Sequence, residues 1–280
     1  MAKTSRRDFF KRAAALSLLP LATAEATTVK QNLRFIHITD SHMDLSDADS
    51  VEAMKLMVSF VNENYKDLDF VLFGGDNFNN NASSNSDALE FIKIVEGLHC
   101  PYYSVRGNKE ASPKHDDKIG RDGFKKLFIS NRALEVSDED WKLEINGYMV
   151  LGLDSCIDGA NNGRYSDSTL LFAEKALKSK KPTLILNHHP YTNYWGGKEA
   201  KDIHKYVLNN TAEVQKRLFS YDNLLLTLSG HKHIDSVTKI NKCKVVVTRG
   251  FIRPLDLDMF PMRYVELDGN RVSEKLIYTA

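Results

Sequence analysis

The sequence has few cysteines, and none of them stands close to another. Cys100, Cys156 and Cys243 are far apart and lie in or near apolar stretches. This spacing excludes a zinc finger and a Cys-x-x-Cys redox motif. An odd number also leaves at least one thiol unpaired, even in an oxidising compartment. We therefore expect the three side chains to be buried as small apolar groups rather than to bind metal.

A net charge of one sign, a long apolar run and an internal linker are also missing. The 38 lysines and arginines nearly cancel the 37 aspartates and glutamates, so no overall field favours nucleic acid or a membrane surface as a partner. The apolar run Ala13–Ala24 is too short to span a bilayer as a stable helix, which argues against a stable membrane anchor. No segment rich in proline, glycine and serine follows Thr28, which favours one domain after the N-terminal segment.

The N-terminal segment has the order of a secretory signal. A basic stretch with adjacent arginines, residues 5–12, precedes the apolar run, and alanines at 22, 24 and 26 form small-residue cleavage sites. The stretch resembles the twin-arginine export signal, Ser-Arg-Arg-x-Phe. A basic amphipathic helix is the alternative. We expect residues 1–26 to be a twin-arginine-type signal peptide read by the twin-arginine export machinery, and residues 27–280 to be the exported domain, periplasmic or secreted.

Five short apolar segments are predicted to be buried strands, and each ends in side chains that can bind a metal. After the first strand, Asp40 and His42 stand two residues apart, and in an extended segment such side chains point the same way. One Asp-x-His triplet arises often by chance, but five such strand ends in one chain do not. The remaining candidate ligands at the strand ends are Asp76, Asn108, His188, His231 and His233.

The chemistry of these side chains limits the metal and the substrate. Carboxylates, an amide and imidazoles without a thiolate favour Zn, Mn, Fe or Co over soft metals. Seven candidate ligands exceed the usual need of one ion, so two ions fit better. Two divalent ions and two aspartates leave a positive excess that suits a phosphate oxygen. Gly75, Gly107 and Gly230 precede ligands, where we expect the chain to leave a strand sharply.

Strands and helices alternate in the first half, which predicts parallel crossovers. Helices are expected over 47–65, 89–95, 122–129, 168–178 and 200–219. A hairpin is expected to turn at Asn146-Gly147. The last strands, 234–240, 245–248, 263–267 and 272–278, are expected to be antiparallel. Parallel units followed by hairpins predict an α/β fold with two mixed sheets packed face to face and helices outside.

The ordered series Asp-x-His, Gly-Asp, Gly-Asn, His-x-Pro and Gly-His-x-His, from Leu33 to about Arg249, resembles the calcineurin-like metallophosphoesterase family. The resemblance implies a four-layer αββα sandwich and hydrolysis of phosphomonoesters or phosphodiesters by a metal-bound hydroxide. It implies two divalent or mixed-valence ions of Fe, Mn or Zn. Carried over residue by residue, it assigns one ion to Asp40, His42 and His233, the other to Asn108, His188 and His231, and both to Asp76.

Two positions depart from the family. Lys109 stands where a histidine usually donates a proton to the leaving group or helps to hold the phosphate. A lysine there either donates the proton or fails to, and His189, His115 and Lys232 are candidates to compensate. The resemblance thus implies Asp76, Asn108, Lys109 and His189 as catalytic residues, and the alternative is a metal-bearing binding or sensing protein with weakened catalysis. Asn79 replaces the metal-bound tyrosine of purple acid phosphatases, which excludes that subfamily.

Overall fold

The computed structural model describes residues 32–82, 84–111, 119–130, 132–192 and 207–280. Within these ranges, no helix has both the length and the apolar character that crossing a membrane requires. The three cysteines are unpaired, and of them Cys243 is buried while Cys100 and Cys156 are partly exposed.

The first sheet has five strands in the order β12-β11-β1-β2-β3. At its centre, β1 (Asn32–Ile38) runs parallel to β2 (Phe70–Phe73), which runs parallel to β3 (Tyr102–Ser104). On its other side, β1 pairs antiparallel with β11 (Pro261–Asp268), and β11 forms a hairpin with β12 (Arg271–Tyr278). The last two strands therefore join the sheet that contains the first described strand, a long-range pairing that local sequence patterns do not indicate.

The second sheet has seven strands in the order β4-β5-β6-β7-β8-β10-β9. Strands β6, β7, β8 and β10 are parallel, whereas β4, β5 and β9 are antiparallel to their neighbours. The β5–β6 hairpin turns at Asn146 and Gly147, both with positive φ, as predicted. The expected antiparallel ending is wrong for β10, which also pairs parallel with β8. The strand bounds are β4 Glu135–Ser137, β5 Asp140–Ile145, β6 Tyr148–Gly152, β7 Thr183–Leu186, β8 Leu224–Ser229, β9 Ser236–Ile240 and β10 Cys243–Val247.

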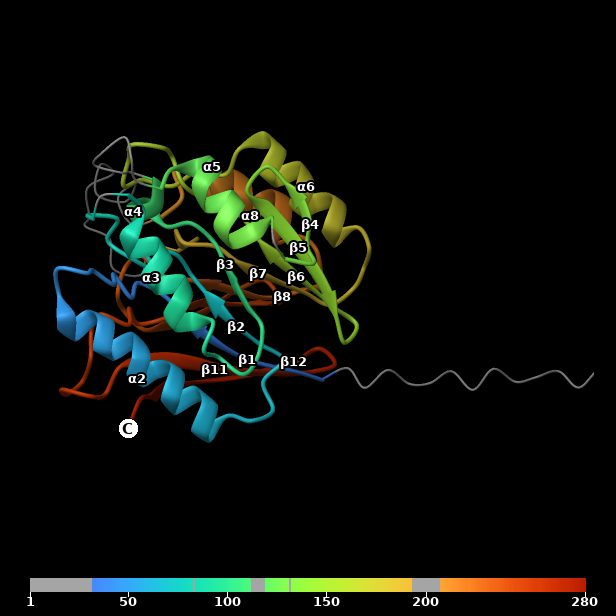
Figure 1. The fold of residues 1–280 in the computed structure, drawn as a ribbon. Helices are drawn as coiled ribbons and strands as arrows, with labels where there is room; N and C mark the ends of the chain where they lie inside the picture. Colours follow the sequence, from blue (N-terminus) through green and yellow to red (C-terminus); the bar gives the residue numbers. More distant parts are fainter. Residues whose placement is uncertain (1–31, 83, 112–118, 131, 193–206) are drawn as a thin grey trace, which may run out of the picture.

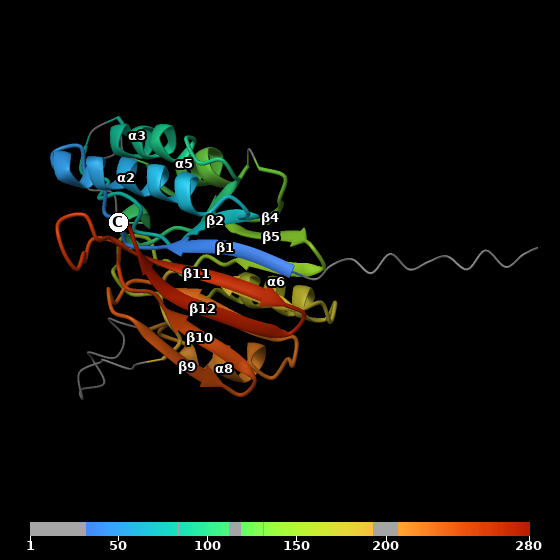
Figure 2. The same ribbon diagram turned by 90° about the horizontal axis from the view of Figure 1, so that it is seen from below.

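Helices cover the outer faces of the two sheets. Figures 1 and 2 show α2 (Ala48–Asn64) and α3 (Ser86–Val95) on one side, and α6 (Asp167–Leu177) and α8 (Thr211–Leu218) on the other. The alternation along β7 agrees with this order, because Leu184 and Leu186 join the core shared with α2 and α3, whereas Ile185 joins the core under α6 and α8. The layers are therefore helices, sheet, sheet, helices, which confirms the predicted αββα sandwich.

The helix starts follow local sequence. Asp47 precedes α2 and its carboxylate accepts the Asp49 N–H, which satisfies one of the unpaired groups at the helix start. Residues 122–129, expected to be one helix, form the single turn α5 (Arg121–Phe124) followed by a π-helical turn, Lys125–Ile129. A further short helix, α4 (Asn108–Ala111), begins at a candidate ligand. Of the helix expected over 200–219, residues 200–206 lie outside the described residues.

The directions of the strands determine where the candidate ligands lie. Five strands end just before the candidate ligands: β1 before Asp40, β2 before Asp76, β3 before Asn108, β7 before His188 and β8 before His231. Within each sheet these strands are parallel, so their carboxyl ends share one edge. That edge is where open α/β sheets usually bind ligands.

Candidate metal centre

The loops at this edge bring the predicted ligands together. Donor atoms of Asp40, His42 and His233 all lie within 4.8 Å of one another, and so do those of Asp40, Asp76 and His188. Two further candidate ligands adjoin the second of these groups. His231 Nδ1 and Asn108 Oδ1 each lie 3.2 Å from His188 Nε2. All seven candidate ligands thus form one cluster, and the assignment of each to an individual ion stays a prediction.

The candidate ligands do not converge through the extended backbone geometry that we expected. β1 ends at Ile38, and the candidate ligands after it adopt left-handed backbone conformations. This region is uncommon for residues other than glycine, and such conformations, which tend to occur at functional sites, cost of order 1–3 kcal/mol each. The ligands with positive φ are Asp40, His42, Asp76, His231 and His233.

Two glycines are required by close packing around the carboxylates. A Cβ at Gly107 would lie 2.1 Å from the Asp76 nitrogen, and one at Gly230 would lie 2.3 Å from Asp40 Oδ2. Neither has a positive φ, so these glycines are needed for close approach rather than for an unusual backbone angle. The backbone just before Asn108 is therefore in close contact with Asp76, and the backbone just before His231 is in close contact with Asp40.

The hydrogen bonds of His188 indicate a cation site. Its Nδ1 lies 2.9 Å from the Gly74 carbonyl, which can only accept, so Nδ1 bears the proton. Nε2 then presents a lone pair to two other acceptors, Asn108 Oδ1 at 3.2 Å and Asp76 Oδ2 at 3.6 Å. Burial lowers the pKa of His188 to about 3, so the imidazole itself carries no second proton at neutral pH. A lone pair and two oxygen acceptors that converge in this way fit a metal ion.

His42 repeats this arrangement on the other side of Asp76. Its Nδ1 lies 3.0 Å from Asn79 Oδ1, and its Nε2 faces Asp76 Oδ2 at 3.6 Å and His233 Nε2 at 3.1 Å. Burial lowers the pKa of His42 to about 4. Ligands at about 2 Å from a common ion stand roughly 3 Å apart, which these separations approach. Asp76 Oδ2 is equally distant from both imidazoles, as a carboxylate shared by two ions would be.

The two carboxylates have opposite electrostatic environments. Burial opposes the charge of Asp40, but a hydrogen bond with His233 and the nearby imidazoles lower its pKa overall. Burial raises the pKa of Asp76 well above its ordinary value, and the carboxylates of Glu110 and Asp40 raise it further. An ionised Asp76 is therefore unfavourable unless positive charge lies beside it, which bound ions supply.

Glu110 is a buried residue of the site that the sequence did not reveal. Its carboxylate accepts the backbone N–H groups of Gly107 at 2.7 Å, Asp76 at 3.1 Å and Asn77 at 2.7 Å. These bonds tie the loop of Asp76 to the loop of Asn108. A glutamate in a polar loop gives no sign of such partners, because two of them are more than 30 residues away in the chain.

We expect Glu110→Gln to lower the free energy of unfolding of the metal-free protein by about 1–3 kcal/mol. The glutamine NH2 group must face at least one backbone N–H, which leaves a buried donor without an acceptor. Denaturant unfolding measures the change, with Glu63→Gln on the exposed face of α2 as the matched control. Equal stability of the two variants would contradict this role for Glu110.

The backbone of Lys109 contacts one of the candidate ligands. Its backbone N–H donates to Asp76 Oδ1 at 2.7 Å. Burial is the main cause of the low pKa of His42, and the Lys109 ammonium lowers it further. The catalytic role of the Lys109 amine stays a prediction.

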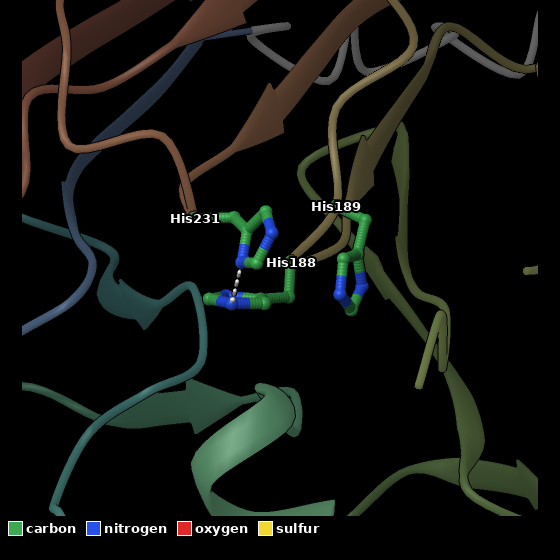
Figure 3. A group of neighbouring side chains, drawn as sticks. All are labelled: His188, His189 and His231. Atoms are coloured by element: carbon green, nitrogen blue, oxygen red, sulfur yellow. Dashed lines mark hydrogen bonds between the residues drawn. The ribbon is translucent and has the colours of Figure 1, made fainter. Parts of the chain in front are cut away.

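His189 lies beside His188 and His231 (Figure 3), and one donor atom from each of the three lies within 4.8 Å of the others. Its Nε2 donates to the Asn161 carbonyl at 3.1 Å, its Nδ1 accepts from Ser155 Oγ at 2.9 Å, and its ring centroid is 4.5 Å from that of His231. Both ring nitrogens thus have protein partners, and a catalytic role for His189 stays a prediction. Burial lowers the pKa of Lys232 to about 8. His115 lies outside the described residues.

Several known proteins are similar to this chain in sequence or in fold. A sequence model of calcineurin-like phosphoesterases matches residues 33–235. A probable glycerophosphodiester phosphodiesterase, GpdQ, of Arcobacter nitrofigilis is 28% identical over 193 residues, which are 68% of this chain and 66% of that protein, just under two thirds. A probable cyclic nucleotide phosphodiesterase of Fibrobacter succinogenes is 25% identical over 78% of this chain and 80% of its own length. The crystal structure of a dimetal phosphatase from Danio rerio shares the fold, with a TM-score of 0.67 and 14% identity over 89% of this chain and 99% of that one.

Proposed function

Because this chain belongs to the calcineurin-like phosphoesterase family, a family of phosphoric ester hydrolases, we propose that it hydrolyses phosphomonoesters or phosphodiesters with the help of two metal ions. One observation carries the proposal: Nε2 of His42 and Nε2 of His188 both face the same oxygen of Asp76 at 3.6 Å, as ligands on either side of a shared carboxylate would. The names of the two bacterial relatives make phosphodiesters the first substrates to test.

Each candidate ligand is assigned to one or both of the two ions. Asp40, His42 and His233 would hold one ion, Asn108, His188 and His231 the other, and Asp76 both, with Fe, Mn or Zn suited to this donor set. Two ions bound there supply charge that orients a phosphoryl group and makes a hydroxide nucleophile available near neutral pH. The protein keeps His42 and His188 neutral by burial, so that their lone pairs are available to the ions.

A binding or sensing protein is the second candidate function, and Lys109 is the observation that favours it. General acid catalysis contributes typically 10²–10⁴-fold, so a residue that fails to donate a proton would leave a metal site with little activity. The complete ligand set supports the enzyme instead, because a chain that had lost catalysis would be expected to lose ligands as well.

A hydrolysis screen separates the two candidates. The protein is stripped with a chelator, reloaded separately with Mn, Zn or Fe, and assayed with glycerophosphodiesters, cyclic nucleotides and phosphomonoesters. The proposal predicts turnover that disappears with the metals and returns on reloading. Stoichiometric metal binding without turnover of any ester would support the binding protein and contradict the enzyme.

We also propose that the protein is exported through its N-terminal signal. The mature chain is expected to begin near Glu25 or Thr27, because the small-residue sites follow the apolar run there. N-terminal sequencing of protein recovered from the periplasm tests this, with Arg6→Lys/Arg7→Lys as a variant that should stay inside the cell. Recovery of only cytoplasmic protein that begins at Met1 or Ala2 would refute it.

A further inference from the structure

A line of three side chains leads from Asp44 through Asn79 to His42. Asn79 Nδ2 donates to Asp44 Oδ2 at 3.0 Å, and Asn79 Oδ1 lies 3.0 Å from His42 Nδ1. Neither Asp44 nor Asn79 is among the predicted ligands. The line begins outside the cluster and ends on one of its imidazoles.

The carboxylate at the start of the line is buried and fully bonded. Asp44 is only 7% exposed, and its second oxygen accepts both the N–H and the hydroxyl of Ser46. Asn81 Nδ2 donates to the same oxygen that Asn79 contacts, at 2.8 Å. Both oxygens of Asp44 thus accept hydrogen bonds from side-chain or backbone donors.

Backbone hydrogen bonds hold the segments that carry Asp44 and Asn79 side by side. The Met43 N–H donates to the Asn77 carbonyl at 3.1 Å, and the Asn79 N–H donates to the Met43 carbonyl at 2.8 Å. The loops that follow β1 and β2 are therefore paired next to Asp44 and Asn79. The amide of Asn79 has little freedom to turn away from either partner.

Only one assignment of donors and acceptors satisfies both hydrogen bonds of this line. Because Asp44 accepts at both oxygens, the NH2 group of Asn79 must face it. Its carbonyl oxygen must then face His42, and His42 must present a proton at Nδ1. The lone pair of a neutral His42 consequently lies at Nε2, which points toward Asp76 and His233.

We propose that Asp44 and Asn79 are positioning residues that fix the tautomer of His42 and so make its Nε2 a metal ligand before any ion binds. That His42 binds a metal rests on the proposed function, whereas the tautomer of His42 does not. It also gives Asn79 a role at the position where purple acid phosphatases have tyrosine. Partners of this kind behind a metal ligand typically change metal affinity by 10–100-fold.

The test reads the tautomer of His42 in metal-free protein. Long-range proton–nitrogen NMR correlations of histidine-labelled protein at neutral pH distinguish Nδ1–H from Nε2–H, and His42→Gln identifies the signal. The wild-type protein is expected to show Nδ1–H for His42. An Nε2–H tautomer, or an equal mixture of the two, would overturn the proposal without any need for a variant at Asn79.

Three variants test how the tautomer is set. Asn79→Leu should lose the single tautomer and bind Mn or Zn 10–100-fold more weakly in titrations of the metal-free protein. Asn81→Leu is the matched control, because it removes an amide from the same Asp44 oxygen without touching His42, and it should change neither readout. The exchange Asp44→Asn/Asn79→Asp retains an acceptor for His42 and should restore both readouts relative to Asn79→Leu.

The outcomes separate this inference from the proposed function. Equal effects of Asn79→Leu and Asn81→Leu, or an unchanged tautomer in Asn79→Leu, would show that Asn79 only supports the loop and would overturn the proposal. If no phosphate ester is hydrolysed but the tautomer and metal affinity respond as expected, the proposed function fails while the role of Asp44 and Asn79 stands.

Discussion

Asp76→Ala should lose its metal ions and its activity together. Asp76 Oδ2 stands 3.6 Å from the lone-pair nitrogens of both His42 and His188, and it is the one ligand assigned to both ions. Its removal takes half of the aspartate charge from the cluster. Removal of one preorganised hydrogen-bond donor already costs 10²–10³-fold in rate, so loss of the ions should lower kcat/KM by at least about 10³-fold.

The control for this experiment is His189→Ala. His189 also lies among the imidazoles, but its two ring nitrogens bind Ser155 and Asn161, so the variant should retain its metals. Elemental analysis of both purified variants gives the comparison. About two ions per chain in Asp76→Ala would contradict the shared-ligand assignment, and loss of metal from both variants would show only that the cluster is fragile.

Lys109→His should raise the rate on esters whose leaving group needs a proton. A nitrophenolate departs without one, whereas an alkoxide or ribose oxygen requires it. If Lys109 is a weak proton donor, the wild-type enzyme should favour activated aryl esters, and the histidine should raise kcat/KM for alkyl or nucleoside esters by roughly 10–10³-fold. Turnover of aryl esters should change far less.

The measurement compares kcat/KM for both classes of ester in both proteins at matched metal content. The backbone N–H of residue 109 still donates to Asp76 Oδ1 in the variant, so the metal site itself should be preserved. Equal effects on the two ester classes would reject a leaving-group role at this position. Alkyl-ester rates that stay flat or fall would instead identify Lys109 as a working donor or a phosphate clamp.

The sequence predicted which residues meet at the centre but not how they do so. Strand ends were readable because short apolar runs are followed directly by Asp40, Asp76 and His188, and parallel strands share a carboxyl edge. The left-handed conformations of Asp40 and His42 were not predicted, since alternation in an extended chain gave the same convergence for a different reason. A prediction of which residues lie together can therefore hold even when the local geometry behind it is wrong.

Long-range partners account for most of what the sequence missed. β11 pairs with β1 across more than 200 residues, and no local pattern specifies that partner. Glu110 lies in the single turn α4 and Asp44 in the loop after β1, and both are buried with hydrogen-bond partners more than 30 residues away in the chain. Such residues become recognisable only when the structure shows where their hydrogen bonds go.

The most direct test of a dinuclear centre is anomalous X-ray diffraction from crystals of the metal-loaded protein, recorded at the absorption edge of the bound metal. We expect two peaks roughly 3.5–4 Å apart, the usual separation in two-metal sites, with the Asp76 carboxylate between them. Asp40, His42 and His233 should surround one peak, and Asn108, His188 and His231 the other. A single peak in fully loaded crystals, or two peaks of which only one contacts Asp76, would contradict this expectation.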